Sequence, residues 1–328
     1  MSSREHRAAP ASPSRVGRIP FVDAARGVAL IAMTIYHFTW DLAHFGWVLS
    51  ETVGSWPWRV FARSIAFTFL FFAGVGLVLA HGDGVRWRAF WRRTAMVALA
   101  AAAVSVATWF FVPDGFVFFG ILHAIALFSV LSLPFVFAPT WLAGALGVTV
   151  LAIGLTQTTT WTQPAALWWV GLVAQPPRSF DYVPLLPWWG ATLLGVAFAR
   201  IALRQGWWRA MATWRMPVDG PLRFLGRHSL AYYLAHQPIL FALLFAFTAL
   251  TGGPDRTEAF LRACERTCQG AQDVAFCASY CPCVAGSLKS SDLWSGFHAG
   301  SLGPAGEERV AEIVSACTAD PILYPRRD

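Results

Sequence analysis

FVDAARGVALIAMTIYHFTWDLAHFGW, residues 21–47, is the stretch of the chain that decides the fold. From residue 28 onward it is apolar over the ~20 residues that a helix needs to cross the hydrocarbon core of a bilayer. Three ionisable side chains, His37, Asp41 and His44, interrupt this run. Such groups are costly in hydrocarbon and by default mark a pathway or a site. Because the run carries these groups and lacks a small-residue cleavage site, we interpret it as a retained membrane helix and not as a removed signal peptide.

Six further apolar stretches follow the first one. Hydrophobic residues make up 56% of the 328 residues and charged residues 13%, which is a membrane composition. The seven stretches are residues 28–47, 60–80, 94–112, 117–138, 141–157, 184–203 and 228–250. An eighth run, residues 165–174, is too short to span alone and suits a re-entrant or interfacial segment. We therefore expect an all-α polytopic membrane protein with seven transmembrane helices, or eight if this run is counted.

The distribution of arginines predicts the orientation of these helices, since cytoplasmic loops hold an excess of positive charge. Basic residues gather in residues 1–20, 86–93 and 200–227, whereas the intervening loops hold only Arg59, Arg63 and Arg178. Seven spans then place the N-terminus in the cytoplasm and the C-terminus in the periplasm, across a bacterial inner membrane. The net charge of +7 is explained by arginines that face anionic lipid, so we expect the lipid bilayer as a partner and no nucleic acid.

Three parts of the chain follow from this pattern. We expect a basic, disordered cytoplasmic segment over residues 1–20, a transmembrane domain over residues 21–250 and a soluble periplasmic tail over residues 251–328. The tail contains all six cysteines of the chain: Cys264, Cys268, Cys277, Cys281, Cys283 and Cys317. An even number of cysteines in so short a segment predicts disulfides, which persist in an oxidising compartment such as the periplasm.

The spacing of the cysteines favours one arrangement of two disulfides. Each of the two Cys-x3-Cys pairs lies on one face of a helix, so an antiparallel hairpin can join Cys264 to Cys281 and Cys268 to Cys277. Fifteen pairings of six cysteines are possible in all. A metal site is the alternative, but the spacing does not match the Cys-x2-Cys pairs of zinc sites, and we expect no metal.

His37, Asp41 and His44 are spaced i, i+4 and i+7, which puts them on one face of the first helix. His37 lies about nine residues from either end of its predicted span, roughly 14 Å from each membrane surface at 1.5 Å per residue. A carboxylate one turn away can fix the tautomer of an imidazole and raise its basicity, as a general base requires. We predict catalytic roles for His37 and Asp41; the alternative is a polar network between helices.

Further polar residues are predicted to line a vestibule that opens outward and admits a substrate. These residues are His44, Arg63, His123, Asp181, Trp188 and His236. Each has a local alternative: Arg63 can extend its charge to the membrane surface, and His123 can bond a backbone carbonyl. For His236 a partner role at a kink before Pro238 fits equally well.

A second group of charged residues lies at the predicted cytoplasmic side. Asp23 and Arg26 stand three residues apart at the start of the first helix, and Arg93 and Arg227 lie at neighbouring cytoplasmic helix ends. Arginines in such a ring suit an anionic ligand. For most of the cytoplasmic arginines the simpler interpretation is that they only set the topology.

Four segments resemble, in order, bacterial membrane proteins related to heparan-alpha-glucosaminide N-acetyltransferase. In residues 21–47 the resemblance rests on Asp23, Arg26-Gly27 and a histidine segment that ends in Trp-Asp-Leu. The later segments are FGILH (residues 119–123), DYVPLLPW (181–188) and LGRHSLAYYLAHQP (225–238). The resemblance covers residues 18–245 and extends to the wider transmembrane acyltransferase group that O-acylates surface sugars. The cysteine tail lies outside it.

The resemblance implies a transmembrane acyltransferase. An acyl group, expected to be acetyl, would pass from cytoplasmic acetyl-coenzyme A or another acyl-coenzyme A to a hydroxyl or amine acceptor, such as a glycan or small molecule, in the periplasm. His37 would act as the base or carry the acyl group, and the inner residues Asp23, Arg26, Arg93 and Arg227 would bind the donor. Two alternatives stay open, a small solute or proton-coupled transporter and a membrane anchor for the cysteine-rich tail.

Overall fold

The structure is a computed structural model that describes residues 19–213, 219–299 and 302–319. The disordered segment expected over residues 1–20 lies almost wholly outside the described residues. Within the described ranges every regular element is a helix and no strand forms, which confirms the all-α prediction. The chain divides into two compact units, the first comprising Met1–Phe38 and Trp56–Leu240 and the second Thr39–Ser55 and Phe241–Asp328.

Five helices in the described residues are long and apolar enough to cross a membrane. They are α1 (Pro20–His44), α3 (Trp56–His81), α4 (Trp87–Phe111), α7 (Leu185–Arg204) and α10 (Ser229–Thr251). Two predicted spans instead contain the shorter apolar helices α5 (Ile121–Ser132) and α6 (Thr140–Thr156). Pro134 and Pro139 lie between α5 and α6, where neither has a backbone N–H to continue the hydrogen bonding of a helix. The run 165–174 contains only a six-residue 3₁₀ helix, η3 (Ala165–Val170), in agreement with its being too short to span.

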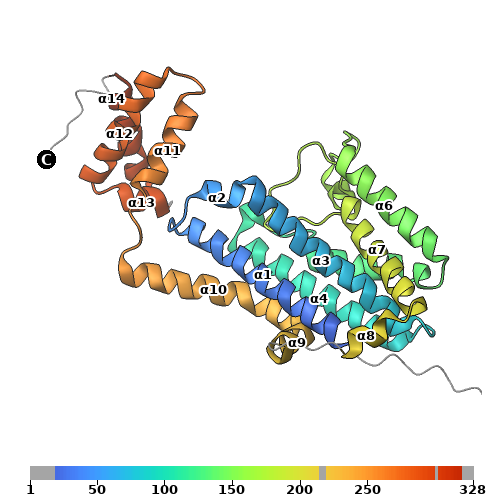
Figure 1. Ribbon diagram of the computed structural model, residues 1–328. Helices are drawn as coiled ribbons and strands as arrows, with labels where there is room; N and C mark the ends of the chain where they lie inside the picture. The colour runs from blue at the N-terminus through green and yellow to red at the C-terminus, as the bar shows by residue number, and fades with distance from the viewer. Residues whose placement is uncertain (1–18, 214–218, 300–301, 320–328) are drawn as a thin grey trace, which may run out of the picture. The chain divides into compact units, whose positions relative to one another are not determined.

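The remaining helices are short or belong to the tail. They are α2 (Ser50–Gly54), α8 (Trp207–Thr213), α9 (Asp219–Arg227), α11 (Thr257–Cys268), α12 (Val274–Ser290), α13 (Trp294–Ala299) and α14 (Pro304–Ala319), with the 3₁₀ turns η1 (Pro113–Gly115) and η2 (Pro134–Val136). The α-helices among them are labelled in Figure 1.

Helix α1 begins eight residues before the predicted span and ends three residues before its predicted end. Pro20 is its first residue, a position that proline tolerates because the first turn has no helical acceptor for an N–H. Gly46, with a left-handed φ of 83°, follows its end. His37 therefore lies seven residues before the last helical residue, or ~10 Å along the axis. Its depth in a bilayer stays a prediction.

Helices of the first unit approach each other closely at glycines. A Cβ atom on Gly195 of α7 would lie 2.0 Å from the carbonyl oxygen of Phe71 on α3, and one on Gly74 would lie 2.1 Å from that of Thr192. Helices α6 and α7 meet in the same way, since a Cβ on Gly190 would lie 2.6 Å from the carbonyl oxygen of Gly147. Small residues at such crossings are typical of helix packing in membranes.

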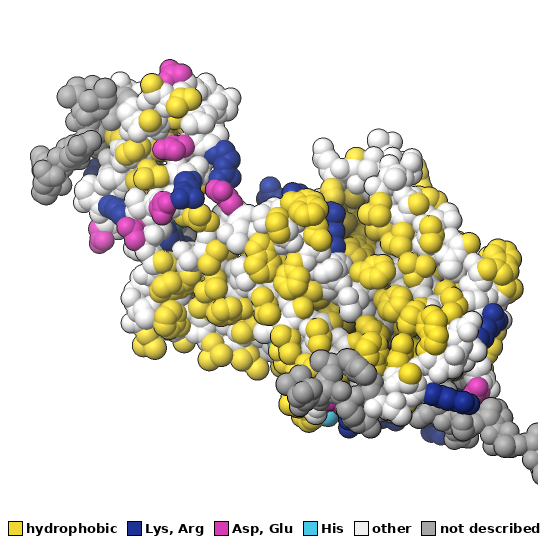
Figure 2. Space-filling view, in the orientation of Figure 1, with side chains coloured by type: hydrophobic (Ala, Val, Ile, Leu, Met, Phe, Trp, Pro, Cys, Tyr) yellow, Lys and Arg dark blue, Asp and Glu magenta, His cyan; other side chains and the backbone are white. Residues whose placement is uncertain are grey.

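Large apolar side chains cover the outward face of the long helices. In α4 the buried residues are Phe90, Val97 and Ala101, and most of its other side chains are exposed and apolar. Phe110 and Phe111, at its end, are 75% and 84% exposed. Figure 2 shows the resulting apolar surface over the first unit. A helix that is apolar on all sides suits a lipid environment.

Three disulfides hold the cysteine tail together. Cys264–Cys281 and Cys268–Cys277 join α11 to α12, which confirms both predicted pairs and the predicted hairpin. The third disulfide, Cys283–Cys317, joins α12 to α14. It lies in a small core with Val284, Leu288 and Ile313. The six cysteines are thus disulfide-bonded residues and not metal ligands.

The second unit also contains the end of α1 and the helix α2, and polar contacts tie these to the tail. Arg256 donates from Nη2 to the carbonyl oxygen of Phe45 at 2.9 Å. Trp47 donates from Nε1 to Thr248 Oγ1 at 3.0 Å. Arg266 forms an ion pair with Glu51. The segment after α1 and the tail helices therefore form one compact unit.

Candidate functional site

A cavity of about 770 Å³ opens inside the first unit. Its wall includes Met33, Tyr36 and His37 of α1, residues of α3 from Val60 to Phe69, and Tyr233 of α10. Ile121 of α5, the end of α6, the connection from α6 to α7 and the start of α7 complete the wall. The volume lies within the ~300–1,000 Å³ that small-molecule sites occupy.

The cavity gathers four of the residues predicted from the sequence. His37, Arg63, Asp181 and Trp188 line it, from α1, from α3, from the segment before α7 and from α7 itself. Its wall is mostly apolar and aromatic, with these few polar groups, which is the usual make-up of a binding site for a small molecule. Arg63 forms no hydrogen bond or ion pair with any residue that the structure describes.

Asp181 joins its own sequence motif to two others at the edge of the cavity. Its Oδ2 atom accepts a hydrogen bond from the backbone N–H of Ile121, the first residue of α5, at 2.7 Å, and one from the Tyr233 hydroxyl at 3.3 Å. Burial raises the pKa of the Asp181 carboxyl above its ordinary value, and the two hydrogen bonds offset only part of this rise. A Cβ on Gly120 would lie 2.3 Å from Oδ2, so the glycine of the FGILH segment makes room for the DYVPLLPW segment.

His123 lies outside the cavity wall. Its Nδ1 accepts the backbone N–H of Gly120 at 3.2 Å, and its Nε2 lies 3.3 Å from Ser105 Oγ. Both ring nitrogens are therefore engaged at the start of α5. The alternative that the sequence suggests is a hydrogen bond of His123 to a backbone carbonyl, and the structure has a bond to a backbone N–H instead.

His236 is also absent from the cavity wall, but it contacts a residue that belongs to the wall. Its ring centroid lies 5.1 Å from that of His37, with the ring planes at 64°. Its Nδ1 lies 2.7 Å from the carbonyl oxygen of Tyr233. Pro238 has no N–H to donate to the carbonyl oxygen of Leu234, four residues earlier. The Nδ1 bond of His236 does not reach that carbonyl, so His236 is not the kink partner that the sequence also suggests. The structure thus brings together two histidines that the sequence separates widely, and no pattern in the sequence indicates the contact.

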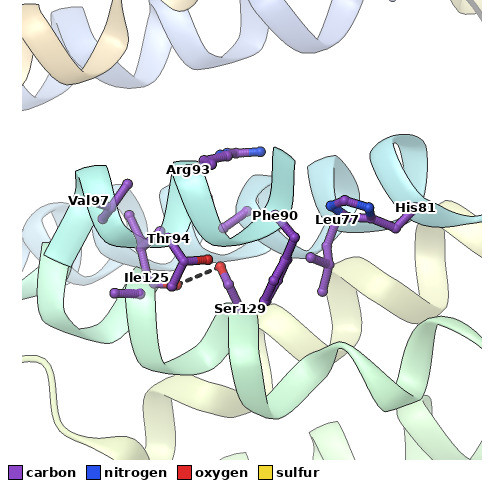
Figure 3. A pocket seen from close by; sticks show the side chains of 10 residues that line it. Leu77, His81, Phe90, Arg93, Thr94, Val97, Ile125 and Ser129 are labelled. Atoms are coloured by element: carbon purple, nitrogen blue, oxygen red, sulfur yellow. Dashed lines mark hydrogen bonds between the residues drawn. The ribbon is translucent and has the colours of Figure 1, made fainter. Parts of the chain in front are cut away.

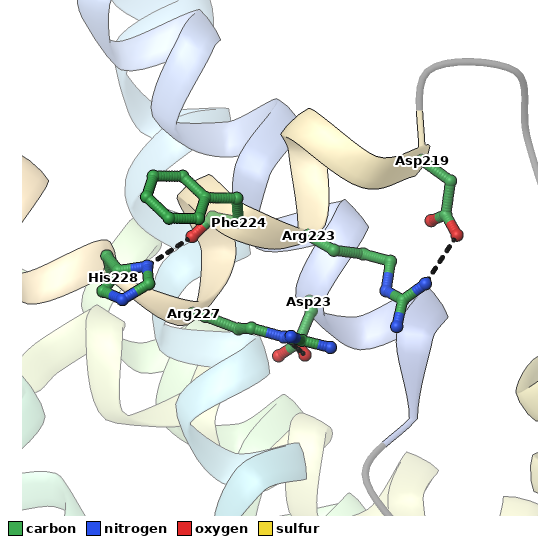
Figure 4. Close-up of polar contacts among 6 residues, drawn as sticks. All are labelled: Asp23, Asp219, Arg223, Phe224, Arg227 and His228. Atoms are coloured by element: carbon green, nitrogen blue, oxygen red, sulfur yellow. Dashed lines mark hydrogen bonds and ion pairs between the residues drawn. The ribbon is translucent and has the colours of Figure 1, made fainter.

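The inner charged residues form two adjacent groups at the start of α1. In the first, Arg227 Nε lies 3.4 Å from Oδ2 of Asp23, whose side chain is 5% exposed (Figure 4). In the second, Arg26 donates from Nη2 to the carbonyl oxygen of Phe72 at 2.7 Å. A Cβ on Gly76 would lie 2.7 Å from Nη2 of Arg26 and 3.8 Å from Nη1 of Arg93. Two guanidinium groups therefore converge at a glycine, an arrangement that favours a bound anion.

Arg93 also lines a small hollow between α3, α4 and α5, of about 20 Å³, with His81 and Thr94 (Figure 3). His81 accepts the backbone N–H of Arg86 through Nδ1 at 3.2 Å, and Ser129 donates to the carbonyl oxygen of Ile125. The hollow is too small for a substrate. His81 Nδ1 and the Ser129 hydroxyl are thus bonded to neighbouring backbone, and the hollow is a feature of the packing of the three helices.

Glycines explain how α9 brings Arg227 to Asp23. A Cβ on Gly226 would lie 1.9 Å from the carbonyl oxygen of Asp23, and one on Gly27 would lie 2.2 Å from that of Leu222. The backbones of α1 and α9 therefore approach each other closely at these two residues. In the pairs Arg26-Gly27 and Gly226-Arg227, each arginine is next in sequence to a glycine at which α1 and α9 approach each other. Gly76 and Gly226 are site residues that a search for charged groups alone misses.

The model of one protein family, described as heparan-alpha-glucosaminide N-acetyltransferase, catalytic, matches residues 18–238. The match covers well over half of the chain. The chain belongs to this family. No curated protein and no solved structure matches it. The family assignment makes the protein a membrane acetyltransferase by class, and it confirms the resemblance read from the motifs.

The matched region of the heparan-alpha-glucosaminide N-acetyltransferase family contains the cavity and both groups of inner residues, and it excludes the cysteine tail. Asp41 and His44 fall within the match but belong to the second unit. Asp41 is fully buried. The ring of His44 stacks on Trp40 at 5.5 Å and contacts Phe45 and Phe241, so it lies among aromatic side chains.

Proposed function

We propose that this family member transfers an acetyl group from acetyl-coenzyme A to a hydroxyl or amine acceptor, such as a sugar or glycan, with His37 as the general base or the acyl carrier. The single observation that carries the proposal is that His37 lies in the wall of a 770 Å³ cavity inside the family-matched region. Histidine is the side chain most often used to move a proton near neutral pH.

The chemical step needs one base and no other reactant. The acceptor hydroxyl or amine attacks the thioester carbonyl carbon, its proton passes to a ring nitrogen of His37, and the C–S bond breaks. The coenzyme A thiolate then takes the proton, so that the products are the acetylated acceptor and the free thiol. In the variant with two steps, a ring nitrogen of His37 attacks the thioester carbonyl carbon and the C–S bond breaks, so that the coenzyme A thiolate leaves. The acceptor then attacks the acetyl-imidazole, its C–N bond breaks, and the acceptor's proton passes to the thiolate as His37 is released.

The donor phosphates are proposed to bind at the inner arginines. Arg26 and Arg93 converge at Gly76, where a side chain would fill the space between them, so the residues present fit an anionic group. Arg26 and His37 are eleven residues apart on α1, or ~16 Å along its axis. Coenzyme A carries its phosphates and its thiol at opposite ends of a long flexible arm, so one molecule suits both places. Arg227, paired with Asp23, would hold the edge of this donor site.

Asp41 is proposed to support His37 from one turn further along α1. Helix geometry puts residues i and i+4 on one face, and a carboxylate there raises the basicity of an imidazole by stabilising the imidazolium that forms when it takes up a proton. The remaining wall residues Arg63, Asp181 and Trp188 would contact the acceptor.

The topology proposed for this chemistry has seven spans, counting α5 and α6, in a bacterial inner membrane. The N-terminus would be cytoplasmic and the C-terminus periplasmic. Two observations support this orientation: the basic segments alternate along the chain, and the tail carries three disulfides, which persist in an oxidising compartment. The donor would then enter from the cytoplasm and the acceptor from the periplasm.

The test is the consumption of labelled acetyl-coenzyme A by the purified full-length protein, without and with added amino sugars. We expect slow release of coenzyme A from the wild type and loss of that release in His37→Ala. His298→Gln, which changes a tail histidine outside the matched region, is the control and should keep the wild-type rate. A wild type that moves a solute along a gradient without consuming acetyl-coenzyme A would instead establish a transporter.

A further inference from the structure

His236 is the buried histidine whose ring contacts His37, and the proposed mechanism has not yet used it. We propose that His236 is a positioning residue: its Nε2 accepts an N–H from His37, so that the other ring nitrogen of His37 presents its lone pair to the cavity. This inference rests on the proposed function of His37.

The hydrogen bond of His236 to the backbone determines which of its nitrogens carries the hydrogen. Nδ1 lies 2.7 Å from the carbonyl oxygen of Tyr233, and a carbonyl oxygen can only accept. Nδ1 is therefore the donor. A neutral imidazole has one donor and one acceptor nitrogen, so Nε2 of His236 is an acceptor.

That acceptor is buried and has no hydrogen-bond partner among the described residues. His236 as a whole is 7% exposed, so water does not readily replace a protein donor. Leaving a buried acceptor unpaired costs free energy. A donor from a neighbouring side chain would therefore stabilise this part of the unit.

The rings of Tyr232, Tyr233 and His37 contact His236, and the two tyrosine hydroxyls already donate their hydrogens to other groups. The Tyr233 hydroxyl donates to Asp181. The Tyr232 hydroxyl lies 2.7 Å from Thr34 Oγ1, and because Thr34 donates its own hydrogen to the carbonyl oxygen of Leu30, the tyrosine must donate to the threonine. The third ring is His37. Of the three, only His37 has an N–H left to give.

The two imidazoles are close enough for this bond. With centroids 5.1 Å apart, rotation of the His37 side chain that turns the rings edge to edge brings one nitrogen of each to hydrogen-bond distance. The bond made by one ring nitrogen decides the tautomer of a histidine. A neutral acceptor achieves this without placing a second ion next to His37 in apolar surroundings. His37 would then face the cavity with a fixed lone pair, as both variants of the mechanism require.

The experiment compares His236→Phe, which keeps a ring against Tyr232 but removes the acceptor, with His236→Gln, which retains an acceptor oxygen. We expect His236→Phe to lower kcat for acetyl-coenzyme A consumption about 10- to 100-fold at unchanged KM, the size of loss that follows removal of a hydrogen-bond partner from a metal-ligating histidine. His236→Gln should recover part of the loss. The control is Tyr232→Phe, which removes a hydroxyl from the same helix while Thr34 keeps its bond to Leu30, and its rate should match the wild type.

The tautomer itself is measured by ¹⁵N spectroscopy of the histidine-labelled full-length protein. We expect a single tautomer of His37 in the wild type and a mixture in His236→Phe. A mixture of His37 tautomers in the wild type would overturn the inference, and this spectrum decides the matter even if His236→Phe fails to fold. An unchanged His37 tautomer and an unchanged rate in folded His236→Phe would overturn it as well. If the wild type consumes no acetyl-coenzyme A but shows a single His37 tautomer that depends on His236, the proposed function fails and the pairing stands.

Discussion

The first unit and the cysteine-rich tail are stabilised in different ways. In the first unit, helix backbones meet at Gly27, Gly195 and Gly226, and the unit contains no cysteine. In the tail, α11 to α14 surround a small core, and three disulfides join α12 to α11 and to α14. Lipid tails are as apolar as leucine side chains, so helices in a membrane gain from close packing more than from burial. A small segment in water gains too little from burial and is stabilised by covalent links.

The tail should respond most strongly to loss of the disulfide that closes the longest loop. Cys283 and Cys317 are 34 residues apart, and chain entropy assigns such a link a contribution of about 4 kcal/mol to the stability of the tail. We expect the double variant Cys283→Ser, Cys317→Ser to make the tail sensitive to protease. Removal of Cys268–Cys277, only 9 residues apart, should cost about 3 kcal/mol. Equal losses from the two changes would argue against the entropic explanation.

The first unit should respond instead to one added methyl group. Gly226→Ala would place a Cβ 1.9 Å from the carbonyl oxygen of Asp23, and we expect a loss of about 3 kcal/mol in unfolding free energy, measured in detergent. Gly220→Ala, on the same helix but with no atom within 4 Å of the added Cβ, is the matched control. It should be neutral or slightly stabilising, because alanine suits a helix better than glycine. A destabilised control and a tolerated Gly226→Ala would refute the close-contact account.

A smaller effect concerns the pH dependence of the tail. The hydroxyl and then the backbone N–H of Thr257 lower the pKa of the Asp255 carboxyl below its ordinary value. Because the pKa is lowered on folding, the ionised carboxylate stabilises the tail above the unfolded pKa, ~3.9, and this contribution is lost as the pH falls through the folded pKa. Asp255→Asn should therefore lower the Tm of the tail slightly near pH 7 and make no difference well below pH 3. A difference that persists in acid would have another cause.

The same contrast explains what the sequence could predict. The positions of the long helices follow from the length of apolar runs, and the pairing of Cys264 with Cys281 and of Cys268 with Cys277 follows from spacing on helix faces. Both are local properties. Helix α1 begins eight residues before the apolar run that predicts its span, because Asp23 and Arg26 lower the hydropathy of residues that the helix nevertheless includes, with Asp23 paired to Arg227.

The candidate site depends on contacts between distant segments, which the sequence does not encode in a readable pattern. Arg63, Asp181 and Trp188 belong to the predicted outward vestibule, and these three residues share a cavity wall with His37, which is predicted near the midplane. The same reasoning also included His123, whose nitrogens bond Gly120 and Ser105 instead. Neither helix periodicity nor charge could reveal that Nδ1 of His236 bonds the carbonyl oxygen of Tyr233.

The turnover of acetyl-coenzyme A by the His37→Ala variant tests the central claim most directly. General base assistance is worth ~10²- to 10⁴-fold, and the account predicts a loss of that size in a variant that remains folded in the membrane. Release of coenzyme A at close to the wild-type rate by folded His37→Ala protein would contradict it.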